Sequence, residues 1–349
     1  MNTIKIANKY IGAKNKVFVV AELSANHLQK YDLAVETIKM AKAAGADAVK
    51  FQTYTPDTVT IDVENKYFQI NQGTLWDGKT LYELYKEAYM PWDWQSKLRD
   101  IALELDLVWL SSINDKTAVD FLETLDIPAY KLPAFEITDI PLIEYIASKN
   151  KPIIFSSGIS ELSDLEEAIS ACKRIGNDRV VFLKCTSSYP ANLTDMNLLT
   201  IPDMRKRFNL VVGLSDHTLS ASTAIASVAL GAKVVEKHFI LDRKSGGPDA
   251  KFSIEPNEFK EMVKSIREVE ISLGEVSYEL SNDVRKNRMF VRSLFVVKDI
   301  EKGELINEEN IRSIRPGNGL APKYFKEVMG KKIKQKAIRG TPLTWDLIE

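Results

Sequence analysis

The sequence predicts an α/β protein, a (β/α)8 TIM barrel followed by a small β-rich domain. Short β-branched runs alternate with helical patterns before residue 240, which is typical of a parallel βα barrel. The 349 residues accommodate a barrel of about 250 residues and one smaller domain. Polar residues also recur at the ends of the predicted strands, where such a barrel performs its chemistry.

Eight strands are predicted from short apolar runs bounded by polar or turn residues. They are Val17–Leu23, Ala46–Thr53, Leu107–Ser112, Ala129–Leu132, Pro152–Ser157, Val180–Cys185, Leu210–Leu214 and Lys233–Phe239.

Helices are predicted between these strands from apolar residues at helical spacing. They are Leu33–Ala44, Trp94–Leu105, Leu142–Lys149, Asp164–Arg174 and Ser220–Leu230, with Pro256–Leu273 closing the barrel.

One connection is unusually long. About 40 residues, Tyr54 to Asp93, separate the second strand from its helix. Long loops in compact domains are usually functional, so we expect a lid over the site. The alternative is that its aromatic residues only pack over the barrel rim.

The chain beyond the barrel predicts a linker and a second domain. We expect a catalytic domain over 1–273, a linker over 274–286 and the small domain over 287–349. Its short strands are predicted at Ser293–Val297, Glu304–Ile306, Ile311–Ile314 and Lys336–Ile338.

Composition is that of an ordinary globular protein, with 45% hydrophobic and 27% charged residues. Without a membrane-length apolar run or an apolar leader, we expect a cytoplasmic protein with no membrane partner. Residues 284–349 carry 15 Lys and Arg against 8 Asp and Glu, which leaves 32 against 40 for residues 1–283. This asymmetry favours docking of the basic domain on an acidic barrel, and we expect no nucleic-acid partner.

Two of the three histidines, His217 and His238, come at the ends of adjacent predicted strands. Because such ends face one mouth of a barrel, both imidazoles can hold one metal ion. The alternative is a pair of hydrogen-bonded histidines that support the rim.

Charged residues occupy other strand ends. Lys50 and Gln52 share one face of their strand, and Glu236 shares a face with His238, with Lys237 opposite. Buried lysine and glutamate are costly unless they are paired or used. An ion pair inside the barrel is the alternative to a binding site.

Five motifs follow in order along the chain: Glu22 to His27 (ELSANH), Lys50 to Thr53 (KFQT), Gly213 to His217 (GLSDH), Glu236 to Phe239 (EKHF) and Arg315 to Gly317 (RPG). Together they resemble the sialic acid synthase family. The last 65 or so residues resemble its antifreeze-like (SAF, β-clip) domain. Further segments, such as GTLWDG and LKCTSSYP, resemble the branch that makes pseudaminic acid, and the branches that make neuraminic or legionaminic acid are the alternative.

The resemblance implies that phosphoenolpyruvate condenses with an acetamido-sugar aldehyde and that phosphate leaves by C–O cleavage. It implies a divalent metal, Mn²⁺ or Mg²⁺, on His217 and His238, which polarises the aldehyde oxygen. Glu22 or water on the metal would supply the attacking water.

The resemblance also implies which residues bind the substrates. Arg315 would reach the acyl group of a sugar in a partner subunit, so a domain-swapped homodimer is implied. Lys50, Lys131, Ser156 and Ser215 match phosphoenolpyruvate contacts, with Gln52, Ser187 and Tyr189 near them, and Glu136 and Asp249 match carboxylates that hold sugar hydroxyls.

Two other classes of protein remain. Lys50 or Lys131 in a barrel can form a Schiff base, as in lysine-dependent aldolases. A non-catalytic sugar or ice binder is the third possibility, which the histidines and lysines disfavour.

Overall fold

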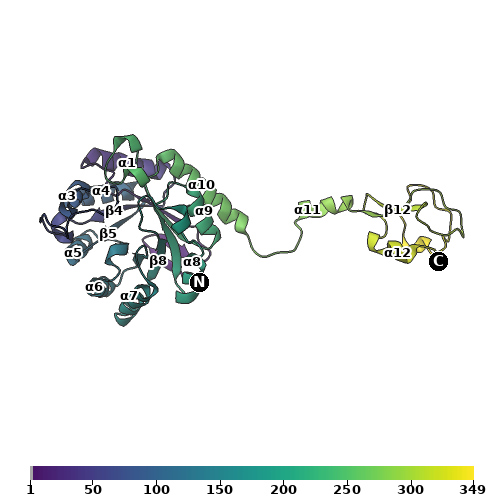
Figure 1. Ribbon diagram of the computed structural model, residues 1–349. Coiled ribbons are helices and arrows are strands. Elements are labelled where there is room, and N and C mark those ends of the chain that lie inside the picture. Colours follow the sequence, from purple (N-terminus) through teal and green to yellow (C-terminus); the bar gives the residue numbers. More distant parts are fainter. Residues whose placement is uncertain (1–2) are drawn as a thin grey trace. The chain divides into compact units, whose positions relative to one another are not determined.

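The computed structural model describes residues 3–349. The chain divides into two compact units, Met1–Gly274 and Glu275–Glu349 (Figure 1), and each has a hydrophobic core of its own.

The first unit confirms the predicted barrel. Eight parallel strands close on themselves in chain order, with β10 hydrogen-bonded to β3. The strands are β3 (Phe18–Glu22), β4 (Ala48–Thr53), β5 (Val108–Ile113), β6 (Tyr130–Leu132), β7 (Ile153–Ser156), β8 (Val180–Cys185), β9 (Val211–Asp216) and β10 (Val234–His238).

Helices surround the strands (Figure 1), and two of them, α5 and α8, were not predicted. Helix α5 is short and begins at Asp115, whose carboxylate caps the amides of Thr117 and Ala118. Helix α8 buries only Ile201 and Met204, so its apolar pattern is weak. The barrel helices are α1 (Tyr31–Ala43), α4 (Trp92–Glu104), α5 (Lys116–Thr124), α6 (Ile140–Ser148), α7 (Leu162–Arg174), α8 (Thr200–Phe208), α9 (Ala221–Ala229) and α10 (Pro256–Leu273).

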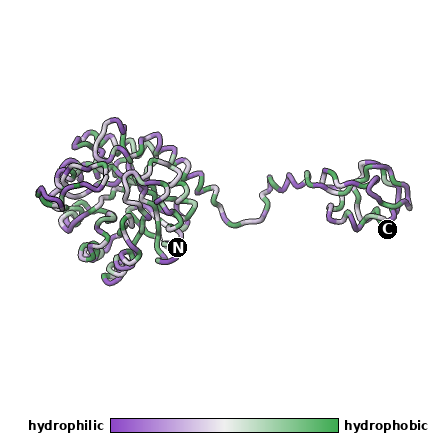
Figure 2. Tube along the Cα trace, in the orientation of Figure 1, coloured by the Kyte–Doolittle hydropathy of each residue, from purple (hydrophilic) through white to green (hydrophobic). Residues whose placement is uncertain are grey.

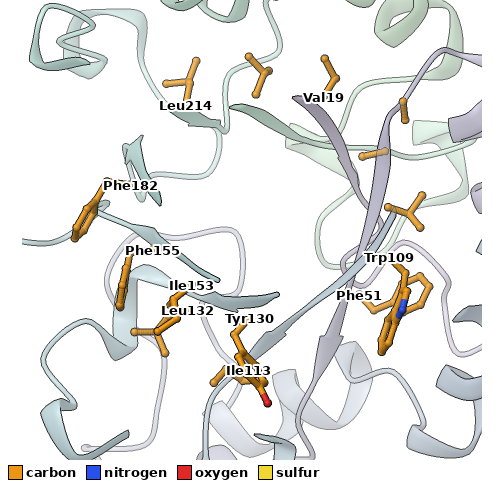
Figure 3. Packing of buried hydrophobic residues seen from close by; sticks show 14 of the residues in the cluster. Val19, Phe51, Trp109, Ile113, Tyr130, Leu132, Ile153, Phe155, Phe182 and Leu214 are labelled. Carbon is orange, nitrogen blue, oxygen red and sulfur yellow. The ribbon is translucent and has the colours of Figure 1, made fainter. Parts of the chain in front are cut away.

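The larger hydrophobic core lies between strands and helices (Figure 3). Phe155 of β7 and Phe182 of β8 stack there with ring centroids 5.2 Å apart. Phe51 of β4 and Trp109 of β5 also pack there, with their rings tilted and their centroids 6.3 Å apart. The outward residues of neighbouring strands thus hold the barrel to its helical layer.

The lumen has an apolar lower half and a polar upper half. On the inner face of β3, Phe18 and Val20 precede Glu22, and on β8, Val181 and Leu183 precede Cys185. The same order, apolar first and polar last along the strand, recurs in β4, β5 and β10. The polar half therefore lies at the C-terminal ends of the strands.

A hairpin that the sequence did not predict completes the lower half. Strands β1 (Thr3–Ile6) and β2 (Lys9–Gly12) pair antiparallel. Ile4, Ile6 and Ile11 are buried in one cluster with the inward apolar residues near the strand beginnings. The hairpin therefore seals the barrel at the end opposite to the polar residues.

The second unit is small and irregular. Strand β11 (Ser293–Val296) pairs antiparallel with β12 (Ile311–Ile314). The other two segments predicted as strands take part only in the single bridges of Leu305 with Lys332 and of Ala337 with Ile300. Short helices complete the unit: α11 (Asn282–Lys286), inside the range predicted as linker, and α12 (Phe325–Val328).

Hydrophobic and hydrophilic residues interchange over short distances along the trace (Figure 2). Within residues 3–349, no helix has both the length and the apolar character that a membrane crossing requires.

Candidate active site

The polar strand ends line a cavity of about 500 Å³ at the C-terminal mouth of the barrel. Most of the predicted site residues meet in it. Glu22 lies fully buried beneath the lining, and Arg315 belongs to the second unit. The predicted residues that line the cavity are Lys50, Gln52, Lys131, Glu136, Ser156, Ser187, Tyr189, Ser215, His217, His238 and Asp249.

Two lysines and two glutamates, Glu22, Lys50, Lys131 and Glu236, form what we term the floor cluster. Lys50 Nζ lies 2.7 Å from Glu22 Oε2 and 3.5 Å from Glu236 Oε1. Lys131 Nζ lies 3.3 Å from Glu236 Oε1 and donates a hydrogen bond to Ser156 Oγ at 2.8 Å. The ion pairing that the sequence left as an alternative is therefore present, and three of the four residues, Lys50, Lys131 and Glu236, also line the cavity.

Glu236 is the centre of this cluster, although it was not predicted as a site residue. Ser215 Oγ donates to its carboxylate at 3.2 Å. Burial opposes ionisation of Glu236, but Lys131 and Lys50 outweigh burial and lower its pKa to about 2. Its spacing of two from His238 was the available signal, because residues two apart share a strand face.

Glu22 is the other carboxylate of the floor, and it differs from Glu236 in its proton affinity. Burial raises the pKa of Glu22 to about 7, against the opposing effect of Lys50. Gln52 Nε2 and the Ser24 amide donate to Glu22 Oε1 at 3.0 and 3.2 Å. Glu22 therefore exchanges a proton near neutral pH while its orientation is fixed.

His217 and His238 lie side by side above this floor, with ring centroids 5.2 Å apart. His217 Nδ1 lies 3.0 Å from the Thr186 carbonyl, which can only accept, so Nδ1 carries a proton. Burial opposes a second proton on this ring, but Cys185 and the Thr186 carbonyl outweigh burial and raise the pKa of His217. Burial lowers the pKa of His238 well below its ordinary value, so His238 is neutral. The third histidine, His27, is buried against Trp94 and does not line the cavity.

The histidine pair has the chemistry of a metal site with open positions. Nδ1 of His238 is buried with no hydrogen-bond partner among the described residues. Within residues 3–349, no group of three or more His, Cys, Asp and Glu side chains is arranged to hold a metal. The two imidazoles therefore fit a divalent ion, which would displace any proton from the ligating nitrogen of His217 and take water or substrate oxygens as its other ligands.

Two carboxylates lie higher in the cavity. Asp249 accepts from Ser24 Oγ, and its pKa is raised by burial. Glu136 accepts from Asn114 Nδ2 at 2.5 Å, and burial raises its pKa to about 7. The Ala25 amide also donates to Asp249, at 3.3 Å. Both carboxylates keep acceptor capacity for the hydroxyl or amide groups of a ligand.

The long connection after β4 reaches the cavity, as the predicted lid requires. It contains α2 (Pro56–Val59) and α3 (Leu81–Ala88). Trp76 lies in the cavity lining with its ring 5.6 Å from Tyr189, and its Nε1 donates to the Pro248 carbonyl at 3.0 Å. Tyr189 in turn packs on His217 at 4.5 Å. The connection thus supplies an aromatic wall above the histidines.

Fold and cavity define a TIM-barrel protein with a polar site at the C-terminal strand ends, whose lining includes two lysines and two histidines. Comparison with known families matches residues 37–278 to the NeuB family and residues 291–349 to the SAF domain. The chain belongs to the NeuB family.

Individual relatives resemble the chain over nearly its full length. A pseudaminic acid synthase from Helicobacter pylori is 45% identical over 332 residues, covering 95% of this chain and 97% of the relative. An N,N'-diacetyllegionaminic acid synthase from Legionella pneumophila is 37% identical, covering 97% and 96%. A crystal structure of an N-acetylneuraminic acid synthetase from Leptospira borgpetersenii superposes with a TM-score of 0.73 at 28% identity, covering 82% of this chain and 95% of that chain.

Proposed function

We propose that this chain catalyses the reaction of a pseudaminic acid synthase. Phosphoenolpyruvate condenses with 2,4-diacetamido-2,4,6-trideoxy-L-altrose and water to give pseudaminic acid and phosphate, which makes the protein a transferase. The observation that carries the proposal is the floor cluster beside two histidines, in a chain 45% identical to a pseudaminic acid synthase. We infer a cytoplasmic location because phosphoenolpyruvate is an intermediate of cytoplasmic metabolism.

Phosphoenolpyruvate is assigned to the floor. Its carboxylate and phosphate need cations and donors, and Lys50 and Lys131 offer both within one buried cluster. Ser156 and Ser215 already bond to members of that cluster, so their hydroxyls are oriented before the substrate arrives. The lysines neutralise charge in this mechanism and form no imine.

His217 and His238 would hold a divalent ion, Mn²⁺ or Mg²⁺, and that ion would supply Lewis acidity at the aldehyde oxygen of the sugar. C3 of phosphoenolpyruvate forms a bond to the aldehyde carbon, and cationic character develops at C2. Water adds to C2 and loses one proton to a base, and the former aldehyde oxygen takes up one proton to become a hydroxyl group. Phosphate then departs with the bridging oxygen as C2 becomes a ketone, and the proton of the C2 hydroxyl passes to the phosphate. Glu22, with a pKa of about 7, is the proposed base that accepts the proton of the attacking water.

The acceptor sugar is assigned to the upper part of the cavity. Glu136, Asp249 and Gln52 present polar atoms to hydroxyl and amide groups. Trp76 and Tyr189 present apolar surface, which suits a deoxygenated carbon better than a hydroxyl. The alternative is that the chain belongs to a branch that makes neuraminic or legionaminic acid. The Legionella synthase of the legionaminic branch is 37% identical to this chain, which is lower than the 45% of the Helicobacter relative.

Phosphate release with a panel of acceptor sugars tests the substrate. We expect kcat/KM for the 2,4-diacetamido-L-altrose acceptor to exceed that for N-acetylmannosamine and for the legionaminic precursor by about 100-fold or more, about 2.7 kcal/mol. A higher value for either competitor would assign the chain to the other branch.

Isotope labelling and metal removal test the chemistry. With ¹⁸O in the bridging position of phosphoenolpyruvate, C–O cleavage sends the label into phosphate. EDTA should abolish turnover and Mn²⁺ should restore it. Label retained in the keto acid, or a lysine trapped by borohydride with pyruvate, would point instead to P–O cleavage or to a Schiff-base aldolase.

A further inference from the structure

A further buried ion pair lies on the outer face of the two strands that lead to the histidines. Asp216 precedes His217 on β9, and Lys237 precedes His238 on β10, and the two residues are register partners in neighbouring strands. Because strand side chains alternate, Asp216 and Lys237 point to the outer face of the barrel. Both side chains are 0% exposed, and Lys237 Nζ lies 2.7 Å from Asp216 Oδ2. The cavity lining includes neither residue.

The ammonium group of Lys237 joins three segments of the chain. Besides Asp216, it donates to the carbonyls of Thr218 at 2.6 Å and Ser220 at 3.0 Å. It therefore ties β10 to β9, to the loop that follows His217, and to Ser220, which caps α9.

The carboxylate of Asp216 holds the same loop from the other side. It accepts from the Thr218 amide at 2.9 Å and from Thr223 Oγ1 at 2.6 Å. Thr218 and Thr223 also share a hydrogen bond of 2.9 Å between their hydroxyls. Each polar group in this network has at least one partner, so the backbone around His217 has little freedom to shift.

Stability alone does not account for a buried pair of this kind. Taking both charges out of water costs several kcal/mol per ion, and apolar residues of similar volume often serve stability equally well. What the pair adds is geometry, since it fixes the relative position of two strand ends. Those strand ends carry the two imidazoles, whose rings are 5.2 Å apart.

We propose that Asp216 and Lys237 are positioning residues that hold His217 and His238 at the spacing that a single divalent cation requires. This inference rests on the proposed metal site. The pair acts through the backbone of the histidines and contacts neither substrate nor metal. The hydrogen bond of His217 Nδ1 to Thr186 then fixes the rotation of the ring, and the ion pair fixes the separation.

The test is a calorimetric titration of the full chain with Mn²⁺ alone. The double variant Asp216→Leu/Lys237→Met replaces the pair by apolar residues, and we expect it to fold with a Tm within a few degrees of the wild type. Its Kd for Mn²⁺ should be about 10- to 100-fold higher than that of the wild type, because losses of this size are typical when groups that orient metal ligands are removed. Binding of phosphoenolpyruvate without metal should change less than about threefold, because the floor cluster is unaltered.

Two single variants on α9 keep the test decisive if the double variant does not fold. Thr223→Val removes the hydroxyl that bonds to Asp216, and we expect Mn²⁺ to bind about threefold more weakly or worse. Ser227→Ala removes a buried hydroxyl that bonds only to Ala224 of the same helix, so Mn²⁺ affinity should be unchanged. Equal affinities in these two variants would overturn the inference.

The Mn²⁺ titrations distinguish failure of the positioning role from failure of the proposed metal site. Wild-type protein that does not bind Mn²⁺, or a His217→Ala/His238→Ala variant that still binds it, would overturn both. If the histidine variant loses Mn²⁺ and the folded double variant keeps the wild-type Kd, the histidines hold the metal and the ion pair has no positioning role.

Discussion

Charge compensation decides the chemistry of the pocket at the scale of single residues. Glu22 and Glu236 balance Lys50 and Lys131, yet only one carboxylate is held firmly ionised. The sequence predicted buried lysines and a buried glutamate at the right strand ends, because period two fixes which residues share a face. It did not predict which groups pair, because pairing depends on side-chain reach across a lumen that closes only in three dimensions.

Removal of either lysine of the floor cluster should weaken the binding of phosphoenolpyruvate more than the binding of the sugar. For Lys50→Met and Lys131→Met we expect the KM of phosphoenolpyruvate to rise about 10- to 100-fold and kcat to fall, because each variant also removes one cation that a buried glutamate of the cluster contacts. Steady-state kinetics with each substrate varied would measure this. Lys151→Met is a matched control, since Lys151 pairs with Glu123 at 2.7 Å and does not line the cavity. A larger rise in the sugar KM than in that of phosphoenolpyruvate would contradict the assignment.

Glu136 should make stability depend on pH in a defined direction. Burial raises its pKa from 4.5 to about 7, so the folded chain holds a proton that the unfolded chain releases. The stabilisation is complete below pH 4.5 and is lost as the pH rises through 7. Glu136→Gln should therefore be more stable than the wild type at pH 8, by up to about 3 kcal/mol, with a smaller difference at pH 5.

Urea unfolding at both pH values would measure that difference. Glu123→Gln is a control of opposite sign, because hydrogen bonds from Lys151 and Tyr130 outweigh burial and lower the pKa of Glu123. The Glu123→Gln variant should be less stable than the wild type at pH 8. A Glu136→Gln variant with a pH-independent difference would show that Glu136 titrates normally.

At the scale of elements, the strands were predictable and several other parts were not. Every barrel strand except β6 contains β-branched residues, and α10 spans the predicted residues Pro256–Leu273. The β1–β2 hairpin was missed because its apolar residues become meaningful only against the lower lumen. Helix α3 was hidden in the long connection, although Thr80 and Glu83 form the capping box that marks its start.

The connection after β4 should contribute to sugar binding through Trp76. Trp76→Phe keeps an aromatic wall and loses the hydrogen bond to Pro248, whereas Trp76→Ala loses both. We expect the sugar KM to rise about twofold to fivefold in the first variant and about 10-fold or more in the second, with the phosphoenolpyruvate KM little changed. Equal kinetics of the alanine variant and the wild type would make the connection a passive cover of the rim.

At the scale of the whole molecule, residues 1–283 are acidic and residues 284–349, which include Arg315, are basic. Arg315 is exposed and follows β12, in a turn that is held by hydrogen bonds from Ser293 Oγ to Pro316 and from the Gly317 amide to Met289. A fixed turn presents an arginine at a defined place, which suits recognition of an acyl group. The sequence predicted this role only through family resemblance, since spacing alone does not reveal what an exposed arginine contacts.

We infer a domain-swapped homodimer in which Arg315 completes the site of the partner subunit. Arg315→Ala should raise the sugar KM far more than that of phosphoenolpyruvate, by about 10-fold or more. Mixing Arg315→Ala chains with His217→Ala/His238→Ala chains should restore activity at one of the two sites. If verified mixed dimers remain inactive, the arginine acts within its own chain or outside the site.

The sealed lower half of the barrel determines the order in which the two substrates bind. With Ile4, Ile6 and Ile11 closing one end, molecules enter and leave by a single mouth. In the proposed arrangement phosphoenolpyruvate binds at the floor before the sugar, because a sugar bound above the floor would close the route to the mouth. Initial-rate kinetics should accordingly show a compulsory sequence with phosphoenolpyruvate leading, and isotope trapping of bound phosphoenolpyruvate should become complete as the sugar concentration rises.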